Sequence, residues 1–306
     1  MRNFLSIADL SRDDLGRILE RATTLREETR QGRWRTELRG KTVALLFQKP
    51  SLRTRVSFEQ GIRQLGGYAL YLSPREVGLG ERESVADVAR VLSRYVDCVV
   101  ARTNRHSDLE MLASHSTVPV VNALSDWSHP CQCLADLLTV REKKDRLAGS
   151  VMAYIGDGNN VLHSLILGAA KVGLHLRAAC PPGYEPDPRV VESAAADREA
   201  TGATLSVLTS PRAAAEGADV LYADVWTSMG QEDESQLRRQ AFAAYRIDAE
   251  LLRLAKPDAV VMHDLPAHRG EEITDEVMDG PQSVVFDQAE NRLHAQKGLL
   301  SWLFAG

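Results

Sequence analysis

The stretch VMAYIGDGNNVLH, residues 151–163, decides the fold class of this chain. Val151–Ile155 is a short apolar run of strand length, Gly156 and Gly158 end it, and a helix is expected from about Val161. A strand that leads through such a turn into a helix is typical of open α/β sheets, where ligands bind at the carboxyl ends of the strands. The dinucleotide fingerprint GxGxxG is incomplete, because Val161 stands where the third glycine belongs.

The same order repeats on both sides of this stretch. Short apolar runs predict further buried strands at 41–47, 68–72, 97–102, 118–124, 175–180, 203–209, 219–224, 259–264 and 283–286. Helix patterns separate the runs of the first half, at 54–65, 84–95, 107–114 and 130–143. Strands that alternate with helices imply parallel sheets covered on both faces. The sequence therefore predicts an α/β protein with mainly parallel sheets flanked by helices.

The length of 306 residues favours two domains, since about 150 residues make one. The charged segment REKKDRLAG, residues 141–149, separates the two series of strands. We therefore expect one domain at 1–144 and a second at 145–288. The last segment, 289–306, carries Leu293, Leu300 and Leu303 at helical spacing, and we expect this helix to pack back on the first domain.

Composition argues against several classes of protein. The net charge of −5, from 37 Lys and Arg against 42 Asp and Glu, provides no general basic field for nucleic acid. No apolar run approaches the roughly 18 residues of a membrane span. The N-terminal segment MRNFLSIADLSRDD has acids where a secretion signal would be apolar. The cysteines (Cys98, Cys131, Cys133 and Cys180) form no CxxC pair, so we expect buried thiols, no metal site and a cytoplasmic protein.

The segment SLRTR, residues 51–55, begins a predicted helix and has the residue types of an anion site. Free backbone N–H groups and the helix dipole favour a phosphate there, and a guanidinium adds charged hydrogen bonds. The segment is not a Walker A loop, because no GxxxxGK[ST] is present. The alternative is that Ser51 only caps the helix while Arg53 and Arg55 form surface ion pairs.

The segment HPCQ, residues 129–132, opens another predicted helix, with proline at the favoured first position. His129 and Gln132 lie three residues apart and can face one ligand together. The alternative is that His129 caps the helix or lies partly in the core. Arg102, at the end of the strand at 97–102, can reach the same crevice.

Amide and acid side chains follow the later strands. Asn159 and Asn160 favour hydrogen bonds to a carboxylate over a pyrophosphate cradle. Asp224 begins the segment DVWTSMG, and the polar QEDESQLRRQ after it indicates a loop. An acid beside such a loop suits a lid that brings a carboxylate to an ammonium group, although Asp224 as a simple loop cap is the alternative. The segments HDLPAHRG, residues 263–270, and ENR, residues 290–292, complete the set.

Together and in this order, these segments resemble the carbamoyltransferase superfamily, and specifically its ornithine carbamoyltransferase family. SLRTR matches the SxRTR motif of the superfamily, and HPCQ matches its HPxQ motif. GDGNNV, DVWTSMGQE, LPAHRG and AENR are signatures of the ornithine branch, and the aspartate branch lacks the SMG loop. The resemblance covers nearly the whole chain in collinear order.

The resemblance implies that the first domain binds carbamoyl phosphate, that the second binds ornithine, and that citrulline and phosphate are the products. It implies a homotrimer, or a multiple of one, and no metal or organic cofactor. It assigns catalysis to Arg102, His129 and Asp264. It assigns the binding of carbamoyl phosphate to Ser51, Leu52, Arg53, Thr54, Arg102, His129, Gln132, Leu265 and Arg292. It assigns the binding of ornithine to Asn160, Asp224, Ser228 and Met229.

The sequence departs from the family at two positions, Asp264 and, less importantly, Gly78, where the family often has glutamine or histidine. The residue before Leu265-Pro266 is normally a cysteine beside the amino-acid substrate, and here it is Asp264. A carboxylate near Asp224 raises the pKa of at least one of the two acids and favours the ammonium form of the substrate. A carbamoyltransferase for another amine, or a non-catalytic paralogue that binds carbamoyl phosphate, are therefore alternatives to ornithine turnover. An NAD-dependent dehydrogenase is weakened by the incomplete glycine fingerprint.

Overall fold

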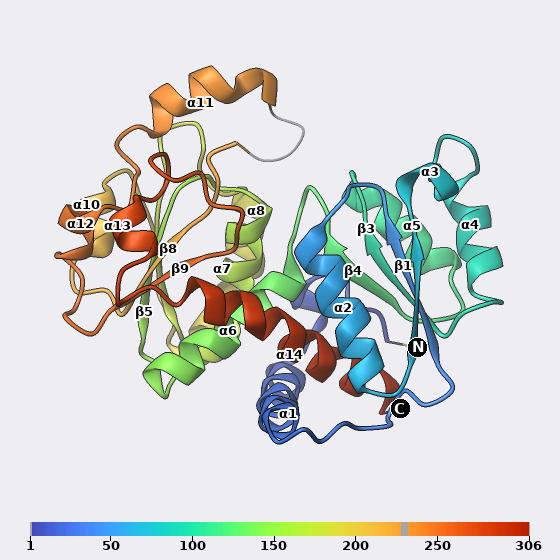
Figure 1. Cartoon of the computed structure of the whole chain (residues 1–306). Coiled ribbons are helices and arrows are strands. Elements are labelled where there is room, and N and C mark those ends of the chain that lie inside the picture. Colours follow the sequence, from blue (N-terminus) through green and yellow to red (C-terminus); the bar gives the residue numbers. More distant parts are fainter. Residues whose placement is uncertain (1, 228–231, 306) are drawn as a thin grey trace. The chain divides into compact units, whose positions relative to one another are not determined.

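The computed structural model describes residues 2–227 and 232–305 and divides the chain into two compact units (Figure 1). Unit 1 contains the residues up to Leu138 and those from Glu290 onward, and unit 2 contains Thr139–Ala289. Each unit has one parallel sheet with helices on it, so the predicted α/β class with two parallel sheets is confirmed. No helix in the described ranges is both long enough and apolar enough to cross a bilayer.

The sheet of unit 1 has four strands in the order β2-β1-β3-β4, all parallel. The strands are β1 (Thr42–Phe47), β2 (Tyr68–Leu72), β3 (Cys98–Arg102) and β4 (Val120–Leu124). The helical elements are η1 (Ile7–Asp9), α1 (Arg12–Arg30), α2 (Leu52–Gln64), α3 (Pro74–Val77), α4 (Val85–Leu92), α5 (His106–His115) and the first part of α6 (Pro130–Lys144). The central strands are buried on both faces, as their continuous apolar sequences require.

The last helix, α14 (Val285–Phe304), joins unit 1 through its residues from Glu290 onward and lies beside α1 and α2 (Figure 1). A Cβ atom at Gly298 would lie 2.5 Å from the Ile18 carbonyl oxygen, so glycine permits the close approach of α14 to α1. Lys297 is buried between the helices, where its Nζ donates to Thr29 Oγ1 at 2.6 Å and to Gln64 Oε1 at 2.8 Å.

The sheet of unit 2 has five parallel strands in the order β7-β6-β5-β8-β9. The strands are β5 (Val151–Ile155), β6 (His175–Ala179), β7 (Leu205–Leu208), β8 (Val220–Ala223) and β9 (Val260–His263). The helical elements are α7 (Asn160–Val172), α8 (Pro188–Ser193), α9 (Ala195–Thr201), α10 (Pro211–Ala215), η2 (Glu232–Glu234), α11 (Ser235–Phe242), α12 (Ala249–Leu252) and α13 (Asp275–Met278). This order places the carboxyl ends of β5, β8 and β9 side by side.

Two sequence-based predictions of secondary structure are wrong. The run at 283–286 is no strand: Ser283 forms an isolated bridge with Val261, and α14 begins two residues later. A four-residue apolar run does not distinguish a strand from a buried helix start. The polar residues 232–240, expected as a loop, are helical: they form η2 and most of α11, in which Arg238 is buried while Gln236, Arg239 and Gln240 are exposed. The helix α1 was not expected from the sequence.

Candidate active site

The beginning of α2 carries the SLRTR segment, the anion site predicted from the sequence. Ser51 is the N-cap residue, but its side chain makes no capping hydrogen bond. Its Oγ donates instead to Thr54 Oγ1 at 2.9 Å. The alternative in which Ser51 only caps the helix therefore does not describe this segment. Leu52 is exposed, Arg53 is half-buried and Thr54 is buried, so burial increases over the first three residues of α2.

Arg292 on α14 joins the predicted segments of unit 1. Its guanidinium donates to Gln132 Oε1 at 2.6 Å and to Thr54 Oγ1 at 3.0 Å. Gln132 in turn donates to Asp136 Oδ1 at 2.8 Å. Arg292, Gln132 and Thr54 are each at most 3% exposed. Residues 238 positions apart in the chain thus form one buried network, which a local reading of the sequence could not show.

His129 lies within the electrostatic field of three arginines. Burial, followed by the positive charges of Arg292, Arg102 and Arg53, holds the pKa of His129 well below its ordinary value. His129 is 4% exposed and Arg102 is 5% exposed. The imidazole is therefore neutral at pH 7 and can donate a hydrogen bond without adding charge. The positive field at this place comes from the guanidinium groups, which suit a phosphate dianion.

Arg55 lies apart from this network. Its Nε donates to Glu59 Oε1 at 2.8 Å, and its guanidinium lies 3.8 Å from the ring centroid of Tyr71. These contacts tie α2 to its own next turn and to β2. Of the two arginines in SLRTR, only Arg53 contributes to the field at His129.

Three acids follow three neighbouring strands of unit 2. Asp157 comes two residues after β5, Asp224 directly after β8 and Asp264 directly after β9. In the sheet, Ala223 pairs with Ile155 on one side and with His263 on the other. Asp224 and Asp264 therefore start from neighbouring positions at the same edge.

The phenol of Tyr154 is affected by all three acids. Burial comes first, and the negative charges of Asp224, Asp157 and Asp264 follow, in raising the pKa of Tyr154 well above its ordinary value. The phenol therefore stays protonated and donates to the Asp157 carbonyl oxygen at 2.9 Å. The carboxylates make this edge of unit 2 a place for a cation.

The carboxylate of Asp224 is held on both oxygens. Asn159 Nδ2 donates to its Oδ2 at 2.7 Å, and the Val225 N–H donates to its Oδ1 at 2.6 Å. Asp224 is 4% exposed, and both of these donors are neutral. A buried carboxylate favours a cationic partner, and the ammonium group of a substrate can supply one.

Asp157 is paired with Arg238, a residue that sequence reasoning missed. Arg238 donates to Asp157 Oδ2 at 2.9 Å, to the Trp226 carbonyl at 3.0 Å and to Glu234 Oε2 at 3.1 Å. Burial raises the pKa of Asp157 to about 6, against the lowering effect of Arg238 and with a further rise from Asp224. The inward face of α11 was the available signal, but the many charges of 231–240 concealed it.

The glycines of GDGNN have a packing reason. A Cβ atom at Gly158 would lie 2.3 Å from the Glu185 carbonyl carbon and 2.4 Å from Pro186 N. This close approach explains Gly158 without a pyrophosphate. His163 is buried, and its Nε2 accepts the Asp187 N–H at 3.2 Å, which agrees with a packing role.

The remaining predicted site residues belong to unit 2, and the structure describes some of them but not all. Asn160 is half-buried at the first position of α7, beside Asn159. Leu265 lies in unit 2 on the turn after β9, unlike the other residues assigned to carbamoyl phosphate, and its N–H donates to His263 Nδ1 at 2.9 Å. Asp264 Oδ1 lies 3.6 Å from the same Nδ1. Ser228 and Met229 lie outside the described residues.

One group of potential metal ligands occurs among the described residues: His268, Glu271 and Glu272. Glu271 accepts a hydrogen bond from Arg239 at 3.0 Å. Glu272 is buried and accepts the His268 N–H, with His263 Nε2 at 3.1 Å from the same oxygen. Both carboxylates therefore already have hydrogen-bond partners within the protein. The four cysteines are buried free thiols, and burial raises the pKa of Cys131 to about 12.

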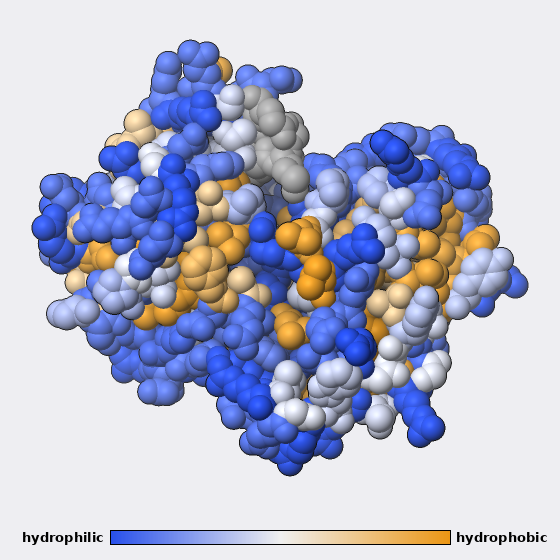
Figure 2. All heavy atoms as spheres, in the orientation of Figure 1, coloured by the Kyte–Doolittle hydropathy of each residue, from blue (hydrophilic) through white to orange (hydrophobic). Residues whose placement is uncertain are grey.

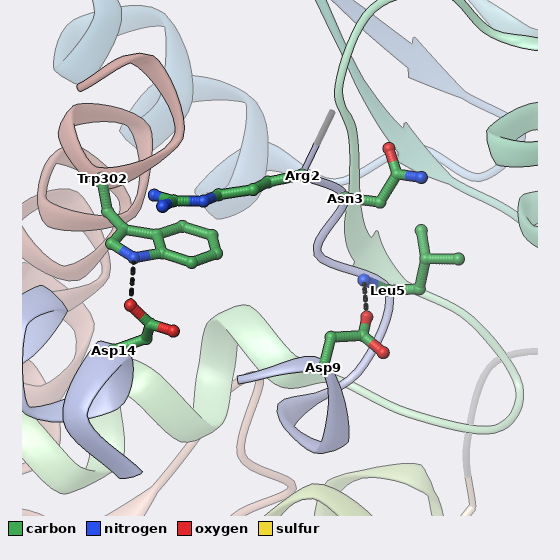
Figure 3. A pocket seen from close by; sticks show the side chains of 6 residues that line it. All are labelled: Arg2, Asn3, Leu5, Asp9, Asp14 and Trp302. Atoms are coloured by element: carbon green, nitrogen blue, oxygen red, sulfur yellow. Dashed lines mark hydrogen bonds between the residues drawn. The ribbon is translucent and has the colours of Figure 1, made fainter. Parts of the chain in front are cut away.

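A hollow of about 510 Å³ in unit 1 is lined by residues other than the predicted ones (Figure 3). Arg2 lies over the Trp302 ring, 5.0 Å from its centroid, and Trp302 Nε1 donates to Asp14 Oδ1 at 2.9 Å. Asp9 accepts the Leu5 N–H at 2.7 Å. The polar groups around this hollow thus have partners within the chain.

Both halves of the chain match models of one protein family. Residues 2–142 match the family model of the aspartate/ornithine carbamoyltransferase carbamoyl-P binding domain, and residues 148–303 match its Asp/Orn binding domain. The ornithine carbamoyltransferase of Thermococcus kodakarensis is 51% identical over 305 residues, which cover 100% of this chain and 97% of the relative. That of Acidothermus cellulolyticus is 54% identical over 303 residues, covering 99% and 96%.

Solved structures agree with these relatives. The ornithine carbamoyltransferase from Pyrococcus furiosus superposes with a TM-score of 0.97 at 49% identity, covering 100% of this chain and 97% of that one. The enzyme from Thermus thermophilus gives a TM-score of 0.88 at 46% identity, covering 99% of both chains. The chain belongs to the aspartate/ornithine carbamoyltransferase family.

Proposed function

We propose that this protein transfers the carbamoyl group of carbamoyl phosphate to the side-chain amine of ornithine, giving citrulline and phosphate. The observation that carries the proposal is the buried network in which Arg292 joins Thr54 and Gln132 beside a neutral His129. Full-length relatives named ornithine carbamoyltransferase support the choice of acceptor.

In unit 1, Ser51, Leu52, Arg53 and Thr54 hold the phosphate of carbamoyl phosphate at the start of α2. Arg102, His129 and Thr54 polarise the carbamoyl carbonyl as negative charge develops on its oxygen. The neutral state of His129 suits this role, because a neutral imidazole donates one hydrogen bond and leaves the phosphate paired with the arginines. Gln132 and Arg292 hold the rest of the group, and the family resemblance adds Leu265 to the residues that bind it.

In unit 2, Asp224 accepts the ammonium group of the amino acid, and Asn160, Ser228 and Met229 complete its binding. The attacking amine must be uncharged, although a free alkyl ammonium has a pKa of about 10.4. The site must therefore help to remove a proton. The departing phosphate can accept a proton as the tetrahedral intermediate collapses, so the reaction proceeds without a metal or an organic cofactor.

Asp264 adds a carboxylate to this edge of unit 2. A second negative charge near Asp224 favours the ammonium form of the acceptor and lowers ornithine turnover at neutral pH. It also favours acceptors with more positive charge than ornithine. The relatives named ornithine carbamoyltransferase do not favour such an amine, and ornithine remains the acceptor that we propose.

The cellular setting follows from the activity. We place the protein in the cytoplasm and in arginine biosynthesis, as a homotrimer or a multiple of one. Figure 2 shows apolar side chains over α2 and the neighbouring edge of the unit 1 sheet. Leu52, Val56 and Tyr68 are 76%, 52% and 65% exposed, and β2 is an edge strand. An exposed apolar face beside an open strand edge suits a contact between copies of the chain.

The experiment is an assay of the purified protein with carbamoyl phosphate and one acceptor at a time: ornithine, lysine, putrescine or acetylated ornithine. Released phosphate and the ureido product are both measured. Ornithine should give citrulline and phosphate in equal amounts. A folded protein that binds carbamoyl phosphate but carbamoylates none of the four would contradict enzymatic function.

A further inference from the structure

The side chain of Asn159 links the start of α7 to the end of β8. Asn159 is the N-cap residue of α7, where its Oδ1 accepts the N–H groups of Val161 at 3.0 Å and Leu162 at 3.2 Å. Its Nδ2 donates to Asp224 Oδ2 at 2.7 Å. One amide group therefore has two separate roles, an acceptor on one atom and a donor on the other.

The acceptor role fixes the direction of the donor. An N-cap needs an oxygen, so the two helix N–H groups determine which end of the amide faces α7. The Tyr154 hydroxyl, whose shorter hydrogen bond goes to the Asp157 carbonyl, also lies 3.4 Å from Asn159 Oδ1. The two helix N–H groups thus hold Oδ1, and the NH2 group has to point toward Asp224.

The carboxylate of Asp224 is fixed in turn. Its second oxygen accepts the N–H of Val225, so its rotation is restrained at both ends. The remaining lone pairs of the carboxylate have a set direction in which to accept an ammonium group. Aspartate and serine can also cap a helix, but neither supplies an NH2 donor, so capping alone does not explain asparagine at this position.

We propose that Asn159 is a positioning residue for the acceptor amine, acting through Asp224 by holding its carboxylate in the orientation that receives the substrate ammonium. This inference rests on the proposed function and adds a residue to the binding of the acceptor. Asn159 itself does not contact the reacting atoms.

The variants Asn159→Ser and Asn159→Asp separate positioning from capping. Both keep an oxygen that can cap α7, and both lose the amide donor. Asp248 on α12 offers a matched control, because its Oδ1 caps Glu250 and Leu251 in the same way. Asp248→Ser should lower stability modestly and leave the KM for every substrate unchanged.

For Asn159→Ser we expect the KM for ornithine to rise about tenfold or more, on the scale of one lost hydrogen bond to a charged group. The affinity for carbamoyl phosphate, measured by direct titration, should stay within twofold. Asn159→Asp should raise the KM further at pH 8, because two carboxylates then face each other. That excess should shrink as the pH is lowered, because protonation removes the repulsion between two carboxylates.

The groups around this pair that also carry or take up charge are Asp157, Arg238, Asp264 and Tyr154. They are the same in the wild type, whose pH profile serves as the reference. A melting curve of each variant shows whether it is folded, and Asn159→Ser serves alone if Asn159→Asp does not fold.

An unchanged KM for ornithine in folded Asn159→Ser would overturn the positioning role, and so would an equal loss of carbamoyl phosphate affinity. The wild-type reaction in the same assay distinguishes this result from failure of the proposed function. If the wild type forms no citrulline, the proposed function fails. If the wild type forms citrulline and the variant matches it, only the role of Asn159 fails.

Discussion

The two units place opposite charges on the same kind of scaffold. In unit 1, the start of α2, the end of β3 and the helix α14 bring Arg53, Arg102 and Arg292 near a neutral histidine. In unit 2, the corresponding edge of the sheet carries Asp157, Asp224 and Asp264, with Arg238 bonded to the first of them. The same kind of parallel sheet thus carries positive charges in one unit and negative charges in the other, and we expect the first to suit an anion and the second a cation.

The comparison also shows two ways to use burial. In unit 1 burial keeps His129 uncharged, so that it can serve as a neutral donor. In unit 2 burial raises the pKa of Asp157 to about 6 despite its arginine partner. Asp224 differs from Asp157 because the two groups that donate to it, Asn159 Nδ2 and the Val225 N–H, are both neutral.

The largest effect is expected for Arg292→Ala. This change removes a buried guanidinium and its hydrogen bonds to Gln132 Oε1 and Thr54 Oγ1, of which Thr54 Oγ1 keeps another donor, Ser51. We expect kcat/KM to fall by about a hundredfold to a thousandfold, the scale of one lost donor at a developing negative charge. Steady-state kinetics of citrulline formation measures it. Arg239→Ala, at an exposed ion pair in unit 2, is the control and should stay near wild type. A folded Arg292→Ala protein with less than a tenfold loss would contradict the assignment.

The second effect compares the two arginines of SLRTR. Arg53→Ala should weaken carbamoyl phosphate binding by about 2–3 kcal/mol, because a charged hydrogen-bonded contact is lost. Arg55→Ala is the matched control, since Arg55 is engaged with Glu59 and Tyr71. Direct titration of carbamoyl phosphate separates them. Equal losses for both variants would show that the anion site extends further along α2 than we describe.

The third effect tests whether unit 2 has one carboxylate more than ornithine needs. Asp264→Cys removes a negative charge next to Asp224 and should raise kcat for ornithine about tenfold, or about 1.4 kcal/mol of barrier. The pH–rate profile should shift as well, because a negative charge near the acceptor amine is gone. Kinetics from pH 6 to 9 measures both. An unchanged profile together with unchanged amine preference would show that the Asp264 side chain takes no part.

The smallest effect concerns a buried cation of unit 1 outside the proposed site. Burial lowers the pKa of Lys297 to about 8 in the folded protein. The unfolded chain, with a lysine pKa near about 10.4, then binds more protons between pH 8 and pH 10, so this group makes unfolding harder as the pH rises. Lys297→Met should remove that rise in the free energy of unfolding and leave the KM values unchanged. Denaturant titrations at pH 7.5 and 9.5 measure the free energy of unfolding of both proteins. If it rises as much in Lys297→Met as in the wild type, other groups cause the rise.

The sequence predicted the fold better than the connections within the site. Strands such as β1 and β5 are continuous apolar runs, and burial on both faces of a parallel sheet requires that pattern. The run at 283–286 failed because four apolar residues fit a helix start equally well. The helix at 235–242 was missed because its sequence is mostly polar and only two of its residues, Arg238 and Phe242, are buried.

Within the site, residue types and places were predictable, and partners were not. SLRTR and HPCQ could be assigned to helix starts, but the bonds of Arg292 join residues far apart in the chain. The sequence pointed to Asn160 for the acceptor, while its neighbour Asn159 makes the bond to Asp224. Two adjacent asparagines look alike in the sequence, and only the capping geometry of α7 distinguishes them.

The division of charge between the units is tested most directly by measuring both KM values in Arg53→Ala and Asp224→Asn. Arg53→Ala should raise the KM for carbamoyl phosphate and leave that for ornithine nearly unchanged. Asp224→Asn keeps the size of the side chain, removes its charge and should raise only the KM for ornithine. If either variant raised both values equally while staying folded, the assignment of one substrate to each unit would be contradicted.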